Sequence, residues 1–251
     1  MRRGDAMKTK LTLAALLLSA AGFVAPASAA ERARIFLNGA FDTGSLDFAQ
    51  SRTFKEFAEE GKIDTAYSAG TGIGFEVGLH WRFNRRLGVM ASVATVGRDG
   101  SASVSASLPH PLYLAKPRQA TATQEGLSYR ETTIHVDFVY AIPSGKSLEF
   151  LLFAGPSFVG AKSDLVTQLN YRQSYPYDEV SVTGVALGEA SDNVVGFNIG
   201  GGLDYRLGKR VGLGAQVRFT TASVKLVPPA APTISIDAGG FQAAVGVRIF
   251  F

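Results

Sequence analysis

The sequence predicts an all-β fold, an eight-stranded antiparallel up-and-down transmembrane β-barrel with short periplasmic turns and long extracellular loops. Segments of alternating apolar and polar residues recur along the chain, and the connections between them alternate between short and long. One face of the segments is apolar and the other carries the charges, which is the polarity of a barrel that faces lipid. After the N-terminal region, no apolar run approaches the roughly 18 residues of a transmembrane helix.

The N-terminal region has the order of a secretory signal peptide. Lys8 and Lys10 precede an apolar run over residues 11–24, and Ala27-Ser28-Ala29 then forms a cleavage site. We therefore expect residues 1–29 to be a cleaved signal peptide and residues 30–251 to be the barrel domain, with translation starting at Met1 or Met7. The alternative is an anchoring helix, but the run is shorter than the roughly 20 residues that span a bilayer.

Composition excludes several classes of function. Removing four basic residues and Asp5 with the signal peptide from the 25 basic and 21 acidic residues leaves 21 and 20, a net charge near +1. No basic patch remains that would predict a nucleic-acid partner. The chain has no cysteine, which excludes disulfides, thiol chemistry and cysteine-bound metals, and we expect no cofactor.

The eight predicted strands follow from period-2 alternation. In the second, Phe75, Val77 and Leu79 alternate with Glu76, Gly78 and His80, whereas the fifth is the least regular because Leu151 and Phe153 put apolar bulk on both faces. The eighth ends on Phe251, as expected of a closing strand whose last aromatic lies at the lipid interface. The predicted segments are residues 34–42, 75–83, 87–96, 134–140, 148–158, 195–206, 211–219 and 245–251.

Connection lengths support a membrane barrel over a soluble meander. Residues 84–86, 143–147 and 208–210 make three tight turns, and long polar stretches lie near residues 44–65, 99–126, 163–193 and 225–236. Short periplasmic turns and long extracellular loops give outer-membrane barrels this rhythm. Within the first long stretch, residues 53–60 form either a helical turn or the tip of an extended hairpin.

A weak repeat predicts an aromatic girdle at the ends of the hairpins. Trp81-Arg82 before the turn at residues 84–86 resembles Tyr205-Arg206 before the turn at residues 208–210, and Tyr140 holds the same place before Pro143. We expect these aromatics to lie at one height, at the periplasmic interface. Aromatics at hairpin ends without any membrane role are the alternative. The predicted girdle consists of Trp81, Tyr140, Tyr205 and Phe251.

The opposite face of the strands predicts a polar lumen in which four arginines balance four carboxylates. A buried charge without a partner costs several kcal/mol, so we expect a filled, salt-bridged interior. A selective pore would show a surplus of one sign, which favours the filled barrel over a channel. The predicted lumen network consists of Glu76, His80, Arg82, His135, Asp137, Glu149, Asp204, Arg206, Gln216, Arg218 and Arg248.

We predict neither a catalytic nor a metal site. His80, His135 and Asp137 share the inward face, but the sequence shows no accessible nucleophile or oxyanion site to accompany them. His110 has no second ligand nearby. The glycine-rich stretch at residues 70–74 lacks the lysine and the helix of a phosphate loop.

The long loops carry the candidate binding residues, because the barrel scaffold itself is generic. Two loop segments combine prolines with aromatics, and such stiff, partly apolar segments lose little entropy when they dock a partner. The same segments could instead pack on each other as a lid over the barrel mouth, and both interpretations remain open. The candidates are His110, Tyr113, Tyr175, Tyr177 and Asp178.

The signal peptide, alternating strands, short and long connections and terminal Phe251 resemble the small outer-membrane β-barrel family of OmpA-type, OmpX-type and OmpW-type proteins. The resemblance covers essentially the whole mature chain. It implies residence in the cell outer membrane, contact with outer-membrane lipid and insertion by the barrel-assembly machinery. Our leading hypothesis is a non-enzymatic role in envelope structure or loop-mediated interaction. The alternatives are a narrow OmpW-like pore for small solutes and, third, a lipid-modifying enzyme.

Overall fold

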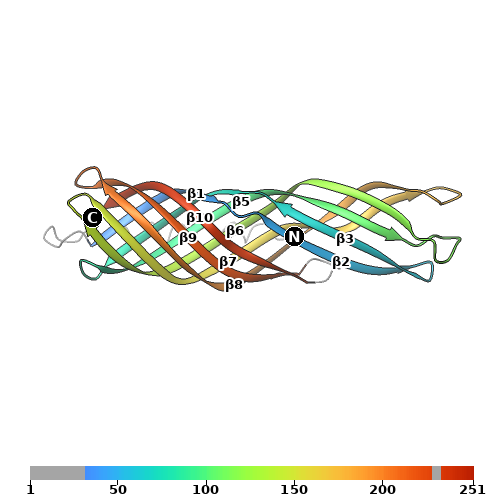
Figure 1. Cartoon of the computed structure of the whole chain (residues 1–251), viewed down its shortest axis with the longest axis horizontal. Coiled ribbons are helices and arrows are strands. Elements are labelled where there is room, and N and C mark those ends of the chain that lie inside the picture. Colours follow the sequence, from blue (N-terminus) through green and yellow to red (C-terminus); the bar gives the residue numbers. More distant parts are fainter. Residues whose placement is uncertain (1–31, 228–232) are drawn as a thin grey trace, which may run out of the picture. The chain divides into compact units, whose positions relative to one another are not determined.

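The structure, a computed structural model, describes residues 32–227 and 233–251, which belong to one compact unit (Figure 1). The predicted signal peptide lies outside the described residues. Within them, no helix is long and apolar enough to cross a membrane. Ten antiparallel strands form one sheet: β1 (Ala33–Asp42), β2 (Leu46–Glu56), β3 (Glu59–Ala69), β4 (Gly72–Arg82), β5 (Leu87–Leu108), β6 (Arg118–Ser144), β7 (Leu148–Gln173), β8 (Val180–Arg206), β9 (Val211–Leu226) and β10 (Ile234–Phe250).

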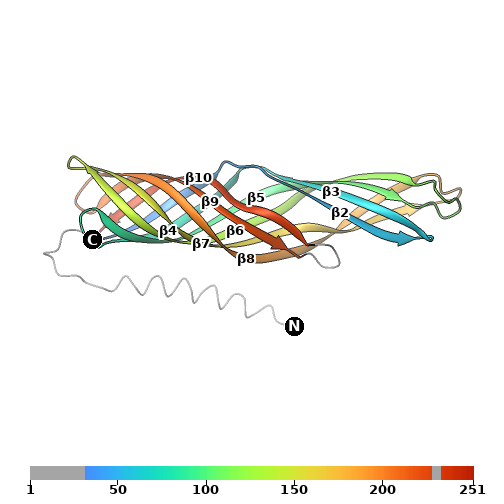
Figure 2. The ribbon, with the colours of Figure 1, turned by 60° about the horizontal axis from the view of Figure 1, so that its bottom comes forward.

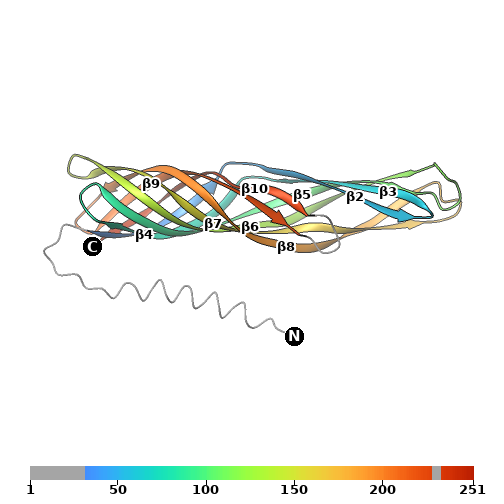
Figure 3. The same ribbon diagram turned by 90° about the horizontal axis from the view of Figure 1, so that it is seen from below.

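Strand order within the sheet is β2-β3-β5-β4-β1-β10-β9-β8-β7-β6, and β5 also pairs with β6. The first half of β5 pairs with β4, from Gly88 to Gly97, and the second half pairs with β3, from Gly100 to Ser107. The β2–β3 hairpin, which comes between β1 and β4 in the chain, therefore extends the sheet along the second half of β5. Figures 2 and 3 show this hairpin at the end of the sheet opposite to the short turns near Phe251.

The all-β, antiparallel prediction is confirmed, but the described chain has ten strands where the sequence predicted eight. The two additional strands are β2 and β3, which occupy most of the predicted first loop. They settle the open question about residues 53–60, because β2 ends at Glu56 and β3 begins at Glu59. The hairpin tip consists of Phe57 and Ala58, both with positive φ, at 50° and 64°.

The prediction of four long loops is wrong for most of their length. Among the described residues, the connections that remain are 44–45 and 57–58 on either side of β2, 109–117 between β5 and β6, and 174–179 between β7 and β8. The last predicted loop includes residues 228–232, which lie outside the described residues. The other residues of the first three predicted loops are strand. The alternation continues there, but the apolar residues change to the buried face, so an analysis that followed only outward apolar residues ended each strand too early.

Strand β9 shows this exchange most clearly. In its first half, Val217 and Phe219 face outward and Arg218 faces inward. In its second half, Ser223 and Lys225 face outward and Val224 faces inward. The other long strands change in the same way, which divides the sheet into two zones. We call the part with an apolar outer face the belt zone; it comprises residues 33–41, 73–83, 87–95, 134–142, 150–158, 195–205, 211–219 and 241–251. The distal zone comprises β2, β3 and the strand residues that lie beyond these segments on the side away from the short turns.

Each zone has its own buried apolar cluster. In the belt zone it is small and includes Phe36, Met90, Leu151 and Phe153. Leu151 and Phe153 are the residues that made the fifth predicted strand irregular, and both face inward, at 6% and 3% exposure. The distal cluster is much larger and includes Leu46, Ile63, Tyr67, Val104, Leu108, Leu165, Val224 and Ile236.

Candidate functional site

The interior of the belt zone contains an ion-paired group close to the short turns. Arg34 donates from Nη1 to Glu149 Oε2 at 2.7 Å and lies 2.6 Å from Asp204 Oδ2. Arg248 Nε donates to Asp204 Oδ1 at 2.9 Å, and Arg82 pairs with Glu149. Sequence reasoning missed Arg34, which is only 3% exposed. The alternation of the first predicted strand could have identified Arg34 as an inward residue, because Arg34 alternates with the outward residues of that strand.

A second group lies in the middle of the same interior, around Arg218. Its Nη1 donates to Glu76 Oε1 at 2.7 Å and its Nη2 to Asp137 Oδ2 at 3.3 Å. Glu76 also accepts hydrogen bonds from Asn38, at 3.0 Å, and from Gln216. Arg218 and Asp137 are 1% exposed and Glu76 is fully buried, so these charges are neutralised by one another rather than by water.

The two interior histidines have structural partners. His80 Nδ1 accepts a hydrogen bond from Arg34 Nε at 2.7 Å, so its neutral ring carries the proton on Nε2. His135 Nδ1 lies 2.8 Å from Ser157 Oγ, which also accepts from Asn198 Nδ2 at 2.9 Å. A serine–histidine contact is one part of a nucleophilic site. Ser157 is 0% exposed, however, so its hydroxyl does not face solvent.

At the short-turn end, the interior opens into a cavity of about 190 Å³ lined by Arg82, Lys146, Glu149 and Arg206, among others. The Arg206 guanidinium lies 4.4 Å from the ring centroid of Phe250, a cation–π contact that holds it against the wall. Glu149 and Asp204, which line this cavity, are the carboxylates that bind Arg34. The cavity therefore ends at the ion-paired group.

A third group lies just beyond the belt zone, around Arg98 and Glu131. Arg98 pairs with Asp42, and its guanidinium lies 6.0 Å from the ring centroid of Tyr129. Glu131 accepts hydrogen bonds from the hydroxyls of Tyr129 and Thr133 and from the Gly239 amide, each at 3.2 Å. Burial raises the pKa of Glu131, and the nearby Asp42 raises it further. Sequence reasoning missed this group because it borders the stretches that were taken for loops.

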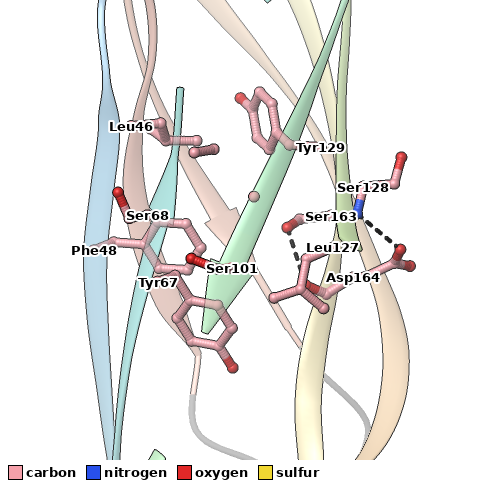
Figure 4. Close-up of a pocket in the computed structure, with 12 residues that line it drawn as sticks. Leu46, Phe48, Tyr67, Ser68, Ser101, Leu127, Ser128, Tyr129, Ser163 and Asp164 are labelled. Carbon is pink, nitrogen blue, oxygen red and sulfur yellow. Dashed lines mark hydrogen bonds between the residues drawn. The ribbon is translucent and has the colours of Figure 1, made fainter. Parts of the chain in front are cut away.

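The distal interior is packed with apolar side chains. Phe48 and Tyr67 stack with ring centroids 4.6 Å apart, and the Tyr67 hydroxyl accepts the Val166 amide at 2.9 Å across the interior. Figure 4 shows the pocket beside them, which is also lined by Leu127 and Tyr129. Its volume of about 20 Å³ is enough for about one water molecule, so it is a packing defect and not a ligand site.

The four predicted girdle aromatics all lie on the outer face at the short-turn end. Trp81 pairs with Ala33, to whose carbonyl the Phe251 amide donates at 2.9 Å. Tyr140 pairs with the first residue of β5, and Tyr205 pairs with the first residue of β7. Their exposures range from 40% for Tyr140 to 64% for Phe251. Their placement fits an interfacial girdle, which itself stays a prediction.

The predicted loop residues lie together at the opposite end. Lys116 Nζ binds Asp178 Oδ1 at 2.7 Å, and His110 Nε2 lies 3.8 Å from the same oxygen. His110 is 1% exposed, and its Nδ1 accepts the amides of Leu112 and Tyr113 at 3.1 and 3.2 Å. The two connections thus pack on each other, and Lys116 holds the pKa of the exposed Asp178 carboxyl below its usual range.

This packing leaves apolar side chains facing solvent. Tyr175 packs edge-on against Tyr177, with ring centroids 6.0 Å apart, yet remains 80% exposed. In the described part of the chain, no group of three His, Cys, Asp or Glu side chains is placed to hold a metal ion. We call the exposed apolar group the distal tip; it consists of Phe57, Leu112, Tyr113, Leu114 and Tyr175, each at least 41% exposed.

The outer membrane protein beta-barrel domain family matches residues 13–248. The chain belongs to this family. Membership places the protein in the outer membrane, as the sequence predicted. No curated protein matches the chain.

The fold is similar to that of a solved outer-membrane protein. The outer membrane protein OprG from Pseudomonas aeruginosa is 11% identical, with a TM-score of 0.52 over 88% of this chain and 96% of that one. At this identity the likeness shows the fold alone. Neisserial surface protein A is 13% identical over 87% of this chain and 97% of its own, with a TM-score of 0.47. The outer membrane protease OmpT from Escherichia coli is 8% identical over the same shares, with a TM-score of 0.44.

Proposed function

We propose that this protein is an integral outer-membrane barrel of eight strands whose interior is closed to solutes and whose distal tip is presented for interaction. The circuit of pairings supports closure. β1 pairs with β4, β4 with β5, each later strand with the next up to β10, and β10 with β1. On this interpretation β2 and β3 are an extension of the barrel wall, not additional members of the ring.

The belt zone supports a membrane-spanning position. Each of its segments contains 9 to 11 residues, which matches the roughly 9–11 residues that a tilted strand needs to cross a bilayer. Its outer face carries exposed apolar side chains such as Phe75, Phe138 and Val245, at 56%, 74% and 56% exposure. Such a surface is stable in lipid and would aggregate in water.

The observation that carries the proposal is that paired charges and then apolar side chains occupy the interior beyond the cavity at the short turns. Ion pairs around Arg34 and Arg218 occupy the belt zone, the Glu131 group follows, and the apolar cluster fills the distal zone. An ion would have to displace paired charges and then cross an apolar stretch, which water itself avoids. The cavity at the short turns therefore does not continue through the interior.

Current through the refolded protein in a planar lipid bilayer tests the closed interior. We expect a stable baseline without discrete steps at either polarity. Reproducible single-channel steps would overturn it and favour the second candidate, a narrow pore. The cavity at the short turns is the observation that favours a pore, and its three cationic side chains against two carboxylates would make such a pore favour anions.

A non-enzymatic role forms part of the proposal. It is supported by the full burial of Ser157 and by the structural hydrogen bonds that occupy both interior histidines. The lipid profile of expressing cells tests it. We expect no change in lipid A or phospholipid, whereas an altered species that disappears in a Ser157→Ala variant would show an enzyme.

The distal tip supports the interaction role, because it presents apolar side chains on loops that His110 and the Lys116–Asp178 pair hold in place. Rigid aromatic side chains are effective contacts because little entropy is lost when they bind. Adhesion of cells expressing a Leu112→Ser/Tyr113→Ser/Leu114→Ser variant should fall relative to wild type at equal surface abundance. Equal adhesion of cells that express the wild type and the variant would show that the distal tip does not mediate the interaction.

A further inference from the structure

The short-turn end carries a concentration of exposed positive charge. Each of the short turns joining β4 to β5, β6 to β7 and β8 to β9 contains at least one exposed Lys or Arg. At this end of the described chain, Glu149 and Asp204 are the neighbouring acids; both turn inward, and their side chains are 13% and 3% exposed. We call the exposed set the basic rim; it consists of Arg32, Arg85, Arg86, Lys146, Lys209 and Arg210.

Backbone hydrogen bonds hold the rim in order around the circumference. The Arg86 carbonyl accepts the Ala141 amide at 2.6 Å, the Arg210 carbonyl accepts the Phe250 amide at 2.9 Å, and the Arg32 carbonyl accepts the Arg82 amide at 2.7 Å. Three of the six rim residues are thus bonded through their backbone to a neighbouring strand of the sheet. The rim charges are spread around the whole mouth instead of forming a local patch.

The positive charge of the basic rim is local, because the protein as a whole is close to neutral. Residues 30–251 carry a net charge near +1, because 21 basic residues face 20 acidic ones. Acidic side chains outnumber basic ones at the other end, where Glu56, Glu59, Glu60, Asp178 and Glu179 lie near the distal tip together with Lys55, Lys62 and Lys116. The charge is therefore segregated along the strands, with the positive end beside the girdle.

We propose that the basic rim binds the phosphate headgroups of anionic phospholipids, of the phosphatidylglycerol class, in the leaflet that it faces. The proposal rests on the membrane-spanning position of the belt zone. Trp81, Tyr140 and Tyr205 would then lie at the headgroup level, and the rim residues follow them by only a few positions. Long Lys and Arg side chains at that depth reach lipid phosphates while their stems stay beside apolar groups.

Trp81 provides the experiment, because it is the only tryptophan in the chain and lies in the girdle at 44% exposure. The protein is refolded into phosphatidylcholine vesicles that contain a small fraction of brominated phosphatidylglycerol or of brominated phosphatidylcholine. Quenching of Trp81 then reports which lipid occupies the rim. We expect phosphatidylglycerol to be preferred by about fivefold or more, the factor that one basic residue near an anionic surface contributes.

A variant with Arg85, Arg86, Lys209 and Arg210 changed to Gln should quench equally with the two lipids. The matched control, Lys55→Gln/Lys62→Gln, removes charge from the distal zone and should keep the wild-type preference. Salt at 0.5 M, about five times the ionic strength at which the screening length is about 10 Å, should reduce the preference of the wild-type protein for phosphatidylglycerol, and this test does not depend on folding of the rim variant.

Equal quenching by the two lipids in wild type would overturn the proposal. Loss of the preference on adding millimolar inorganic phosphate would show an ion site instead of a lipid site and would also overturn it. Failure of the membrane-spanning position has a different signature, because brominated phosphatidylcholine itself would then not quench Trp81.

Discussion

Replacing Arg218 with methionine removes the cation that joins Glu76 to Asp137 in the belt interior. Methionine keeps most of the side-chain volume, and Arg218 packs with its guanidinium 5.1 Å from the ring centroid of Phe153. The packing is therefore largely retained while the charge is lost. Two carboxylates then remain buried without their shared partner.

The magnitude follows from burial and from the hydrogen bonds that remain. Removing one partner of a buried ion pair costs about 3–5 kcal/mol. Arg218 serves two carboxylates, but Glu76 keeps its bonds from Asn38 and Gln216, and Asp137 keeps its bond from Asn198 at 2.7 Å. We therefore expect a loss near the middle of that range, about 4 kcal/mol.

The assay is equilibrium urea unfolding of the refolded protein in lipid vesicles, followed by Trp81 emission. A double-mutant cycle supplies the control. If Glu76→Gln is added to Arg218→Met, one uncompensated charge disappears and we expect about half of the lost stability to return. An Arg218→Met protein within about 1 kcal/mol of wild type, or a double variant no more stable than the single one, would refute the ion-paired interior.

Three further predictions concern other parts of the molecule. Gly246→Ala should lower the yield of folded protein, because its Cβ would overlap the Leu37 carbonyl, whereas Gly97→Ala, where a Cβ meets nothing within 4 Å, should fold as wild type in a gel-shift assay. Burial raises the pKa of Glu131, so the folded state favours its protonated form, and this contribution to stability is lost as pH rises above the ordinary value of 4.5. Glu131→Gln should therefore gain stability relative to wild type between pH 5 and pH 8 in urea titrations, and a constant difference across that range would contradict the assignment. Asp178→Asn should loosen the contact with Lys116 and speed proteolysis within residues 109–117, while the distant Asp237→Asn should cleave at the wild-type rate.

The sequence predicted the belt zone well because its alternation places large apolar residues outward and charged residues inward. The predicted strands that follow the short turns begin at residues 87, 148 and 211, where β5, β7 and β9 begin. Most of the ion-paired interior could be listed for the same reason. Arg34 was missed because the first strand was read only from its outward residues.

The distal zone could not be predicted because its outward residues are small and polar. In β5, Ser101, Ser103 and Ser105 face out, and Ala102 and Val104 face in. A segment rich in serine, with alanine between, has little contrast between its faces and resembles a loop. The pairing of such strands depends on the apolar cluster that they enclose together, which no single segment reveals.

The most direct test of the membrane-spanning barrel is thiol labelling along β9 in intact cells. The chain has no cysteine, so each substitution supplies a unique probe. Ala215 faces outward in the belt zone, and Ser223 faces outward in the distal zone. A bulky maleimide that cannot cross the outer membrane should label Ser223→Cys and leave Ala215→Cys unlabelled until detergent is added. Equal labelling of the two positions in intact cells would contradict the account.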